Sequence, residues 1–158
     1  MSDEVAGARY MARTVKKART ALQGALFAGL RADGSAMRTA HAQVFEVLDA
    51  DGTRLSLLAE RANMSHQAMS ELVAELVGHG YLERFADPSD GRAKLIRPTA
   101  AGTAELARAG DHLGEIRSRW QGRLDGVGAG VTVEEIVDGL ATLIAVCTEL
   151  AAEKATKR

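Results

Sequence analysis

Apolar residues recur every three or four positions along most of the chain, a spacing typical of amphipathic helices. Turn-forming residues around Gly34 and Gly52 divide this pattern into separate segments. The pattern predicts helices over residues 10–30, 39–49, 56–62, 66–77, 100–124 and 133–150. Only two prolines occur, Pro88 and Pro98, and both fall in the one stretch where helical spacing is absent.

Capping residues mark several of the predicted helix ends. Ser65 is a good N-cap because its hydroxyl can accept a hydrogen bond from an unpaired backbone N–H. Thr99 is expected to cap the helix that begins at residue 100. Thr132 and Glu135 have the spacing of a capping box, in which each residue satisfies one N–H of the first turn.

The chain contains one convincing β signal, in residues 81–85 and 93–97. Between these strands, residues 87–92 read Asp-Pro-Ser-Asp-Gly-Arg and consist of turn formers. We therefore predict a hairpin with a long tip that carries Arg92 and a second strand that stops at Pro98.

The order of these elements (a helix, two short helices, a strand, a loop and a strand) is that of a winged helix-turn-helix. We predict a mainly α fold with a small β-hairpin wing. The expected parts are an N-terminal dimerisation helix in residues 1–36, a DNA-binding lobe in residues 37–98 and C-terminal dimerisation helices in residues 99–158. A homodimer is expected because one 158-residue chain offers little to cover the apolar stripes of its first and last helices.

The second short helix of such a lobe can enter the major groove of double-stranded DNA, and the wing can reach the minor groove or the backbone. An arginine suits the negative potential of the minor groove, which makes Arg92 the candidate on the wing. The other candidate DNA-contacting side chains are polar or basic and belong to the same segment: Ser65, His66, Gln67, Ser70, Lys94 and Arg54.

Residues 58–73 (LAERANMSHQAMSELV) resemble the helix-turn-helix of MarR-type regulators. Residues 80–84 and 87–94 resemble the wing of that family, and Thr99-Ala-Ala-Gly102 matches its Thr-x-x-Gly opening of the next helix. The coherent resemblance runs from about His41 to Gly102.

This resemblance implies a homodimeric transcription regulator, usually a repressor, that binds a pseudo-palindromic operator and often releases it when a small, often phenolic, molecule or an oxidant acts on it. It implies a recognition-helix role for Ser65, His66, Gln67 and Ser70 and the role of wing arginine for Arg92. It also implies that Asp90 is a carboxylate that braces the wing. Four aromatic residues could line a pocket for an aromatic effector, although a core or interface position is the simpler interpretation: Tyr10, Phe27, Phe45 and Trp120.

Charge leaves a second function class open. The chain has 20 Lys and Arg against 21 Asp and Glu. The segment from Arg54 to Arg97 has six residues of each sign, so few phosphate contacts and modest non-specific affinity for DNA are expected. The alternative is a winged-helix module for protein–protein interaction without specific DNA binding. Basic residues of the first helix could help to bind DNA: Arg9, Arg13, Lys16, Lys17 and Arg19.

Other function classes find little support. The sequence has no G-x-S-x-G, P-loop, H-E-x-x-H or dinucleotide fingerprint, so we expect no enzyme and no cofactor. The four histidines are scattered, and we expect no metal site. Cys147 lies on the apolar stripe of the last helix, which predicts a buried, inert thiol. With no apolar run near 18 residues and no signal-peptide pattern, we expect a cytoplasmic protein that does not bind membranes.

Overall fold

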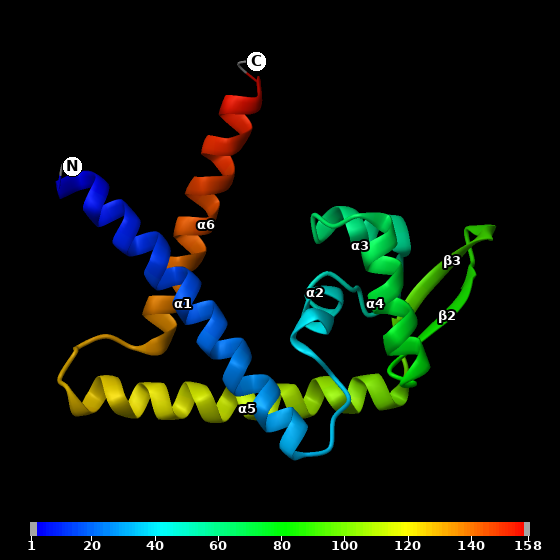
Figure 1. The fold of residues 1–158 in the computed structure, drawn as a ribbon, viewed down its shortest axis with the longest axis horizontal. Helices are drawn as coiled ribbons and strands as arrows, with labels where there is room; N and C mark the ends of the chain where they lie inside the picture. The colour runs from blue at the N-terminus through cyan, green and yellow to red at the C-terminus, as the bar shows by residue number, and fades with distance from the viewer. Residues whose placement is uncertain (1–2, 157–158) are drawn as a thin grey trace. The chain divides into compact units, whose positions relative to one another are not determined.

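A computed structural model describes residues 3–156 of the chain. The described chain is mainly helical, with a three-stranded antiparallel sheet, which confirms the predicted fold class (Figure 1). The elements in chain order are α1 (Asp3–Ala32), the 3₁₀ turn η1 (Thr39–His41), α2 (Ala42–Phe45), β1 (Thr53–Arg54), α3 (Leu55–Arg61), α4 (His66–Gly78), β2 (Leu82–Asp87), β3 (Asp90–Pro98), α5 (Ala100–Gly126) and α6 (Val133–Thr156).

The chain divides into two compact units, one ending at Leu113 and the other beginning at Gly114. The first unit contains α1, the lobe from η1 to β3, and the first part of α5. The second unit contains the rest of α5 and α6. Within residues 3–156, no helix combines the length and the apolar character needed to cross a bilayer.

Helix α4 begins and ends where its capping residues predict. The Oγ of Ser65 accepts a hydrogen bond from the backbone N–H of Ala68 at 3.2 Å. After the helix, Gly80 has a φ of +74°, a conformation that costs other residues a steric penalty. Helical spacing then places Met69, Val73 and Leu76 on one fully buried face.

That buried face of α4 forms the core of the lobe, together with the sheet and α3. The apolar residues that this core contains besides the α4 stripe are Val44, Leu58, Leu82 and Ile96. Strand β3 is the centre of the sheet, with β1 and β2 on either side. Burial of large apolar side chains stabilises such a lobe by roughly 1.5–3 kcal/mol each.

The predicted helix over residues 39–49 is wrong in extent, because the structure has only η1 and the short α2 there. His41 is fully buried, and its Nδ1 accepts a hydrogen bond from the backbone N–H of Arg38 at 3.2 Å. At the other end, the Oγ1 of Thr53 accepts the N–H of Asp49 at 2.9 Å. The Thr53 hydroxyl thus takes up a backbone N–H that a helix over residues 39–49 would have used itself.

The wing differs from the prediction in two ways. Strand β1 was not predicted, because two residues are too few to show an alternating pattern. The predicted long tip is also wrong, since β2 and β3 continue to Asp87 and Asp90, and only Pro88 and Ser89 lie between them. Arg92 therefore lies on β3 near the turn rather than in a loop.

A second cluster joins the end of α1 to the first part of α5. Phe27, Leu30 and Met37 are buried there, and Phe45 and Ala109 pack against them. The predicted core position of Phe27 is thus confirmed. Tyr10 and Trp120 are exposed in the single chain.

In the second unit, the predicted capping box is confirmed. The Glu135 N–H donates to Thr132 Oγ1 at 3.1 Å, and the Thr132 N–H donates to Glu135 Oε2 at 2.7 Å. The prediction of a buried Cys147 is wrong for the single chain, in which this residue is exposed. The physical reason is that α6 presents its apolar stripe to solvent, with Ile144 at 67% exposure.

The Thr-x-x-Gly opening of α5 generates a stability prediction. The Oγ1 of Thr99 accepts the N–H of Gly102 at 3.0 Å, and a Cβ on Gly102 would lie 2.0 Å from the carbonyl oxygen of Tyr81. We expect Gly102→Ala to lower the free energy of unfolding by about 1–3 kcal/mol, because the backbone must move apart. Urea denaturation measures this change.

Gly110→Ala is the matched control in the same helix, since a Cβ there meets no atom within 4 Å. It should raise the free energy of unfolding by about 0.5–1 kcal/mol through helix propensity. Equal effects of the two substitutions would contradict the close approach of α5 to Tyr81.

Candidate nucleic-acid interface

The N-terminal edge of α4 presents polar side chains to solvent. Ser65, His66 and Gln67 are exposed, and Ser70 is half-buried. This edge is also the positive end of the helix dipole, with backbone N–H groups that can bind a phosphate. Helix α4 lies beside the hairpin of β2 and β3, which it contacts through β2 (Figure 1).

Gln67 is oriented by its neighbour one turn along the helix. Its Nε2 donates to Oε1 of Glu71 at 2.6 Å. This bond fixes the plane of the Gln67 amide, so Glu71 has an orienting role besides any contact with a base. The carbonyl oxygen of Gln67 has no hydrogen-bond partner in the described chain. The arrangement can present one acceptor to a base edge.

On the wing, Arg92 and Lys94 are exposed on β3. The backbone N–H of Arg92 donates to Asp90 Oδ1 at 3.1 Å, which fixes the strand but not the side chain. Neither basic side chain has a hydrogen-bond or ion-pair partner among residues 3–156. Both charges are therefore available to an external anion.

Arg54 has a different environment from the one predicted. Its Nε and Nη2 donate to Oδ2 of Asp87 at 2.8 and 2.6 Å, and its Nη2 lies 3.7 Å from Asp90. The guanidinium thus joins β1 to both ends of the turn between β2 and β3. Arg54 holds the wing in place, and its side chain is already paired with two carboxylates.

Asp87 is the functional residue that the sequence analysis missed. It is 6% exposed, and its Oδ1 accepts the Oγ–H and N–H of Ser89 at 2.6 and 2.8 Å. These bonds, with the Arg54 contact, lower the pKa of Asp87 from 3.8 to about 2. The Asp-Pro-Ser sequence was a signal for this turn, because an Asp side chain often accepts the N–H two residues later.

Most other cations of the lobe are paired with carboxylates. Arg61 contacts Asp49 at 2.8 Å, and Arg97 contacts Glu83 at 2.7 Å. In the lobe as described, the basic side chains without such a partner are Arg84, Arg92 and Lys94. The free positive charge of the lobe thus lies on its wing.

The back of α4 is tied to η1 through Glu75. Because Nδ1 of the neutral His41 ring accepts the Arg38 N–H, Nε2 carries the proton and donates to Glu75 Oε2 at 2.9 Å. The side chain of Arg38 contacts the same carboxylate oxygen. The hydrogen bond from His41 and then that from Arg38 lower the pKa of Glu75. These bonds fix the orientation of α4.

A mostly polar groove lies between α1, α2 and the turn that precedes α4. Arg19 of α1 and Gln43 of α2 line it, together with Asn63 and Met64 of the turn. The guanidinium of Arg19 has no hydrogen-bond or ion-pair partner in the described part of the chain. The groove therefore offers one free cation next to the turn that precedes α4.

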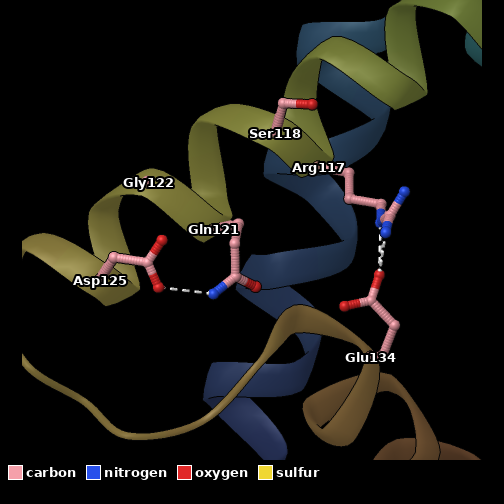
Figure 2. A pocket seen from close by; sticks show the side chains of 6 residues that line it. All are labelled: Arg117, Ser118, Gln121, Gly122, Asp125 and Glu134. Carbon is pink, nitrogen blue, oxygen red and sulfur yellow. Dashed lines mark hydrogen bonds and ion pairs between the residues drawn. The ribbon is translucent and has the colours of Figure 1, made fainter.

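A second pocket lies in the unit that begins at Gly114, between α5 and the start of α6 (Figure 2). Its polar groups satisfy one another. Arg117 pairs with Glu134, the Gln121 Nε2 donates to Asp125 at 2.8 Å, and the Gln121 Oε1 accepts the Val133 N–H at 2.8 Å. These bonds hold the first turn of α6 against α5, so the pocket has mainly a structural role.

The wing brace generates a prediction about acid. Since the pKa of Asp87 is lower in the folded chain than its ordinary value, its ionised form stabilises the wing fully above about pH 4. This contribution is lost as the pH falls toward 2. The carboxyl resonance of Asp87, followed by NMR, should titrate near pH 2.

Ser89→Ala should raise the pKa of Asp87, because the Ser89 hydroxyl is the largest cause of its depression. Ser56→Ala is the control, since this exposed serine lies on α3 away from the turn. A wild-type titration near the ordinary value of 3.8 would show that Asp87 does not brace the wing.

Comparisons with known proteins give one family match. Residues 37–93 match the model of the MarR family. This segment runs from η1 through α4 to the first part of β3, so it contains the polar edge of α4 and Arg92. No curated protein matches the chain.

Solved structures share the fold. CouR from Rhodococcus jostii RHA1, bound to p-coumaroyl-CoA, is 22% identical with a TM-score of 0.66, over 86% of this chain and 90% of CouR. Sco3205 from Streptomyces coelicolor, a MarR family regulator in complex with DNA, is 24% identical with a TM-score of 0.64, over 91% and 87%. PcaV from Streptomyces coelicolor, in complex with its natural ligand, is 20% identical with a TM-score of 0.60, over 94% and 96%. The family match and these shared folds identify residues 37–93 as a MarR-family winged helix-turn-helix segment, in a chain that has the fold of the MarR-family regulators.

Proposed function

We propose that the protein is a homodimeric transcription regulator that binds a pseudo-palindromic operator, represses transcription and releases DNA when a small aromatic acid binds. The observation that carries the proposal is the pairing of an exposed, polar N-terminal edge of α4 with a braced wing on which Arg92 is unpaired. A MarR-family regulator of similar fold has been solved with DNA, which supports this assignment.

In this proposal α4 enters the major groove, and Ser65, His66, Gln67 and Ser70 contact base edges or phosphates. Arg92 enters the minor groove, where narrow sequences concentrate negative potential, and Lys94 contacts the backbone. Arg54 supports DNA binding mainly through the wing, because Asp87 and Asp90 already hold its guanidinium. The braced turn limits the conformational entropy that the wing loses on binding.

The dimer is proposed to form through residues 1–36 and 99–158, on either side of the DNA-binding lobe in residues 37–98. The apolar stripe of α1 includes Met11, Val15 and Leu22, and all three are at least 40% exposed in the single chain. Helix α6 exposes a comparable stripe that includes Ile144. Two-fold pairing of these helices would bury both stripes and would set two half-sites about 10 bp apart.

The effector is proposed to bind in the groove beside the turn that precedes α4. The Arg19 guanidinium would pair with a carboxylate, and Val47 and Met64 would contact an apolar ring. Met64 directly precedes the N-cap Ser65, so a ligand there acts on the start of the recognition helix. Solved proteins of similar fold hold p-coumaroyl-CoA in CouR and a natural ligand in PcaV, which is consistent with a ligand-responsive protein. Release of DNA would follow from a shift in the population of dimers whose recognition helices have the spacing of the operator.

Arg92→Ala tests the role of the wing. We expect it to weaken binding to the selected operator about tenfold or more, because the minor-groove contact is lost. Thermal unfolding should stay near that of the wild type, since the exposed Arg92 side chain has no hydrogen-bond or ion-pair partner in the described chain. Fluorescence anisotropy with DNA selected from a random pool measures the affinity.

Arg123→Ala is the control, because this exposed arginine lies on α5 outside the lobe. Unchanged affinity of Arg92→Ala would contradict the proposed wing contact. If the wild type binds no duplex DNA even at low salt, the protein–protein interaction module becomes the better assignment.

Arg19→Gln tests the effector site. We expect a set of aromatic carboxylates to raise the thermal midpoint of the wild type and to leave that of Arg19→Gln unchanged, because the carboxylate loses its partner. Arg31→Gln is the control, since Arg31 lies on the same helix but does not line the groove. An aromatic acid that raises the thermal midpoint of Arg19→Gln as much as that of the wild type would contradict the assignment of the groove.

A further inference from the structure

The strongest run of one charge in the chain lies on α1. From Val5 to Ala32 the helix carries six cations and no carboxylate, whereas the segment from Arg54 to Arg97 has no net charge. Unlike most cations of the lobe, the side chains of Arg13, Lys16 and Lys17 have no ion-pair partner among residues 3–156. The charge that a polyanion would meet is therefore concentrated on this helix.

Arg13, Lys16 and Lys17 share one face, which we name the α1 basic face. They line a common surface groove with Thr20 and Ala21, and all three side chains are exposed. At about 100° per residue, Arg13 and Lys17 lie roughly 160° around the helix from Val15, on the apolar stripe. The basic face is thus free while the apolar stripe serves a dimer.

The basic face also adjoins the proposed DNA interface. Arg19, one turn after Lys16, lines the groove that contains Asn63 and Met64, and these residues directly precede the N-cap of α4. From Arg13 to Lys17 the helix rises about 6 Å. Since one DNA strand carries a phosphate about every 3.4 Å along the axis, this length can meet about two successive phosphates.

We propose that the α1 basic face binds the phosphate backbone of the DNA next to the half-site that α4 contacts. This inference rests on the proposed DNA-binding function and adds a second contact surface to it. The lobe itself has no excess of positive charge to attract DNA. In this inference α1 supplies the sequence-independent attraction for phosphates, while α4 and the wing supply sequence selectivity. The released counterions would make affinity depend more steeply on salt than the neutral lobe alone predicts.

The test compares full-length variants on one labelled duplex of mixed sequence, about 40 bp long, which exceeds two half-sites about 10 bp apart. Affinity is measured by anisotropy at KCl concentrations between about 50 and 200 mM. We expect Lys16→Gln/Lys17→Gln to reduce the slope of log affinity against log salt by about one per lost phosphate contact, which is about two per protomer and about four for the bound dimer. The control Arg123→Gln/Lys154→Gln removes two exposed cations from α5 and α6 and should leave the slope unchanged.

The outcomes separate this inference from the proposed function. If Arg92→Ala weakens binding while Lys16→Gln/Lys17→Gln keeps the wild-type slope, the basic face does not contact DNA and the proposed function stands. If no variant and no wild-type protein binds the duplex, both are wrong. The α1 basic face could instead bind the acidic α6 of a second copy of the chain. Sedimentation of the same variants tests this alternative. A dimer weakened by Lys16→Gln/Lys17→Gln would assign the face to that helix and overturn the inference.

Discussion

The contact between Arg54 and Asp87 determines whether the wing has a defined position. Arg54 directly precedes α3, and Asp87 ends β2, so their two hydrogen bonds of 2.8 and 2.6 Å join the helix-turn-helix to the hairpin. A hairpin of two strands has little stability of its own in water. The pairing of β1 with β3 and the hydrogen bonds between Asp87 and Ser89 make the hairpin more rigid, as the proposed DNA contact requires. Contacts made by Arg92 and Lys94 depend on this brace, although neither side chain takes part in it.

Ion pairing inside the lobe explains why its net charge does not describe the potential at its surface. The segment from Arg54 to Arg97 has six cations and six carboxylates, but the ion pairs do not involve all of its cations. Carboxylates neutralise Arg54, Arg61 and Arg97, whereas Arg84, Arg92 and Lys94 on the wing have no such partner in the described chain. A net charge of zero is therefore compatible with a locally positive surface, since the potential near a groove depends on the unpaired charges. On α1 the same reasoning applies to Arg13, Lys16 and Lys17, because no carboxylate among the described residues pairs with these three side chains.

The elements with strong local signals were predictable, and those that depend on tertiary contacts were not. Ser65 and the Thr132–Glu135 box determined helix starts from a few adjacent residues, and both are confirmed. Strand β1 exists only because β3 lies beside it, and α2 ends early because Thr53 takes the Asp49 N–H. In the site, the polar edge of α4 followed from helical spacing. The pairing of Arg54 with Asp87 did not, because it joins residues 33 positions apart whose contact requires the folded sheet.

Helix α4, the proposed recognition helix, is held at two places, and this couples the parts of the proposed mechanism. Its N-terminal edge adjoins the groove that Arg19 lines, and its far end is bonded through Glu75 to His41 and Arg38. Arg38 and His41 follow the end of α1 by a short connection, so both constraints lead back to the same helix. Because the helix core is packed and the Glu75 bonds hold the far end of α4, we expect a ligand in the groove to shift α4 as a rigid body relative to α1 and not to bend it. Such a shift would displace the α1 basic face and the N-terminal edge of α4 from one another. If both surfaces contact DNA, a small ligand therefore opposes binding at two surfaces, and a modest preference for the ligand-bound arrangement suffices for release.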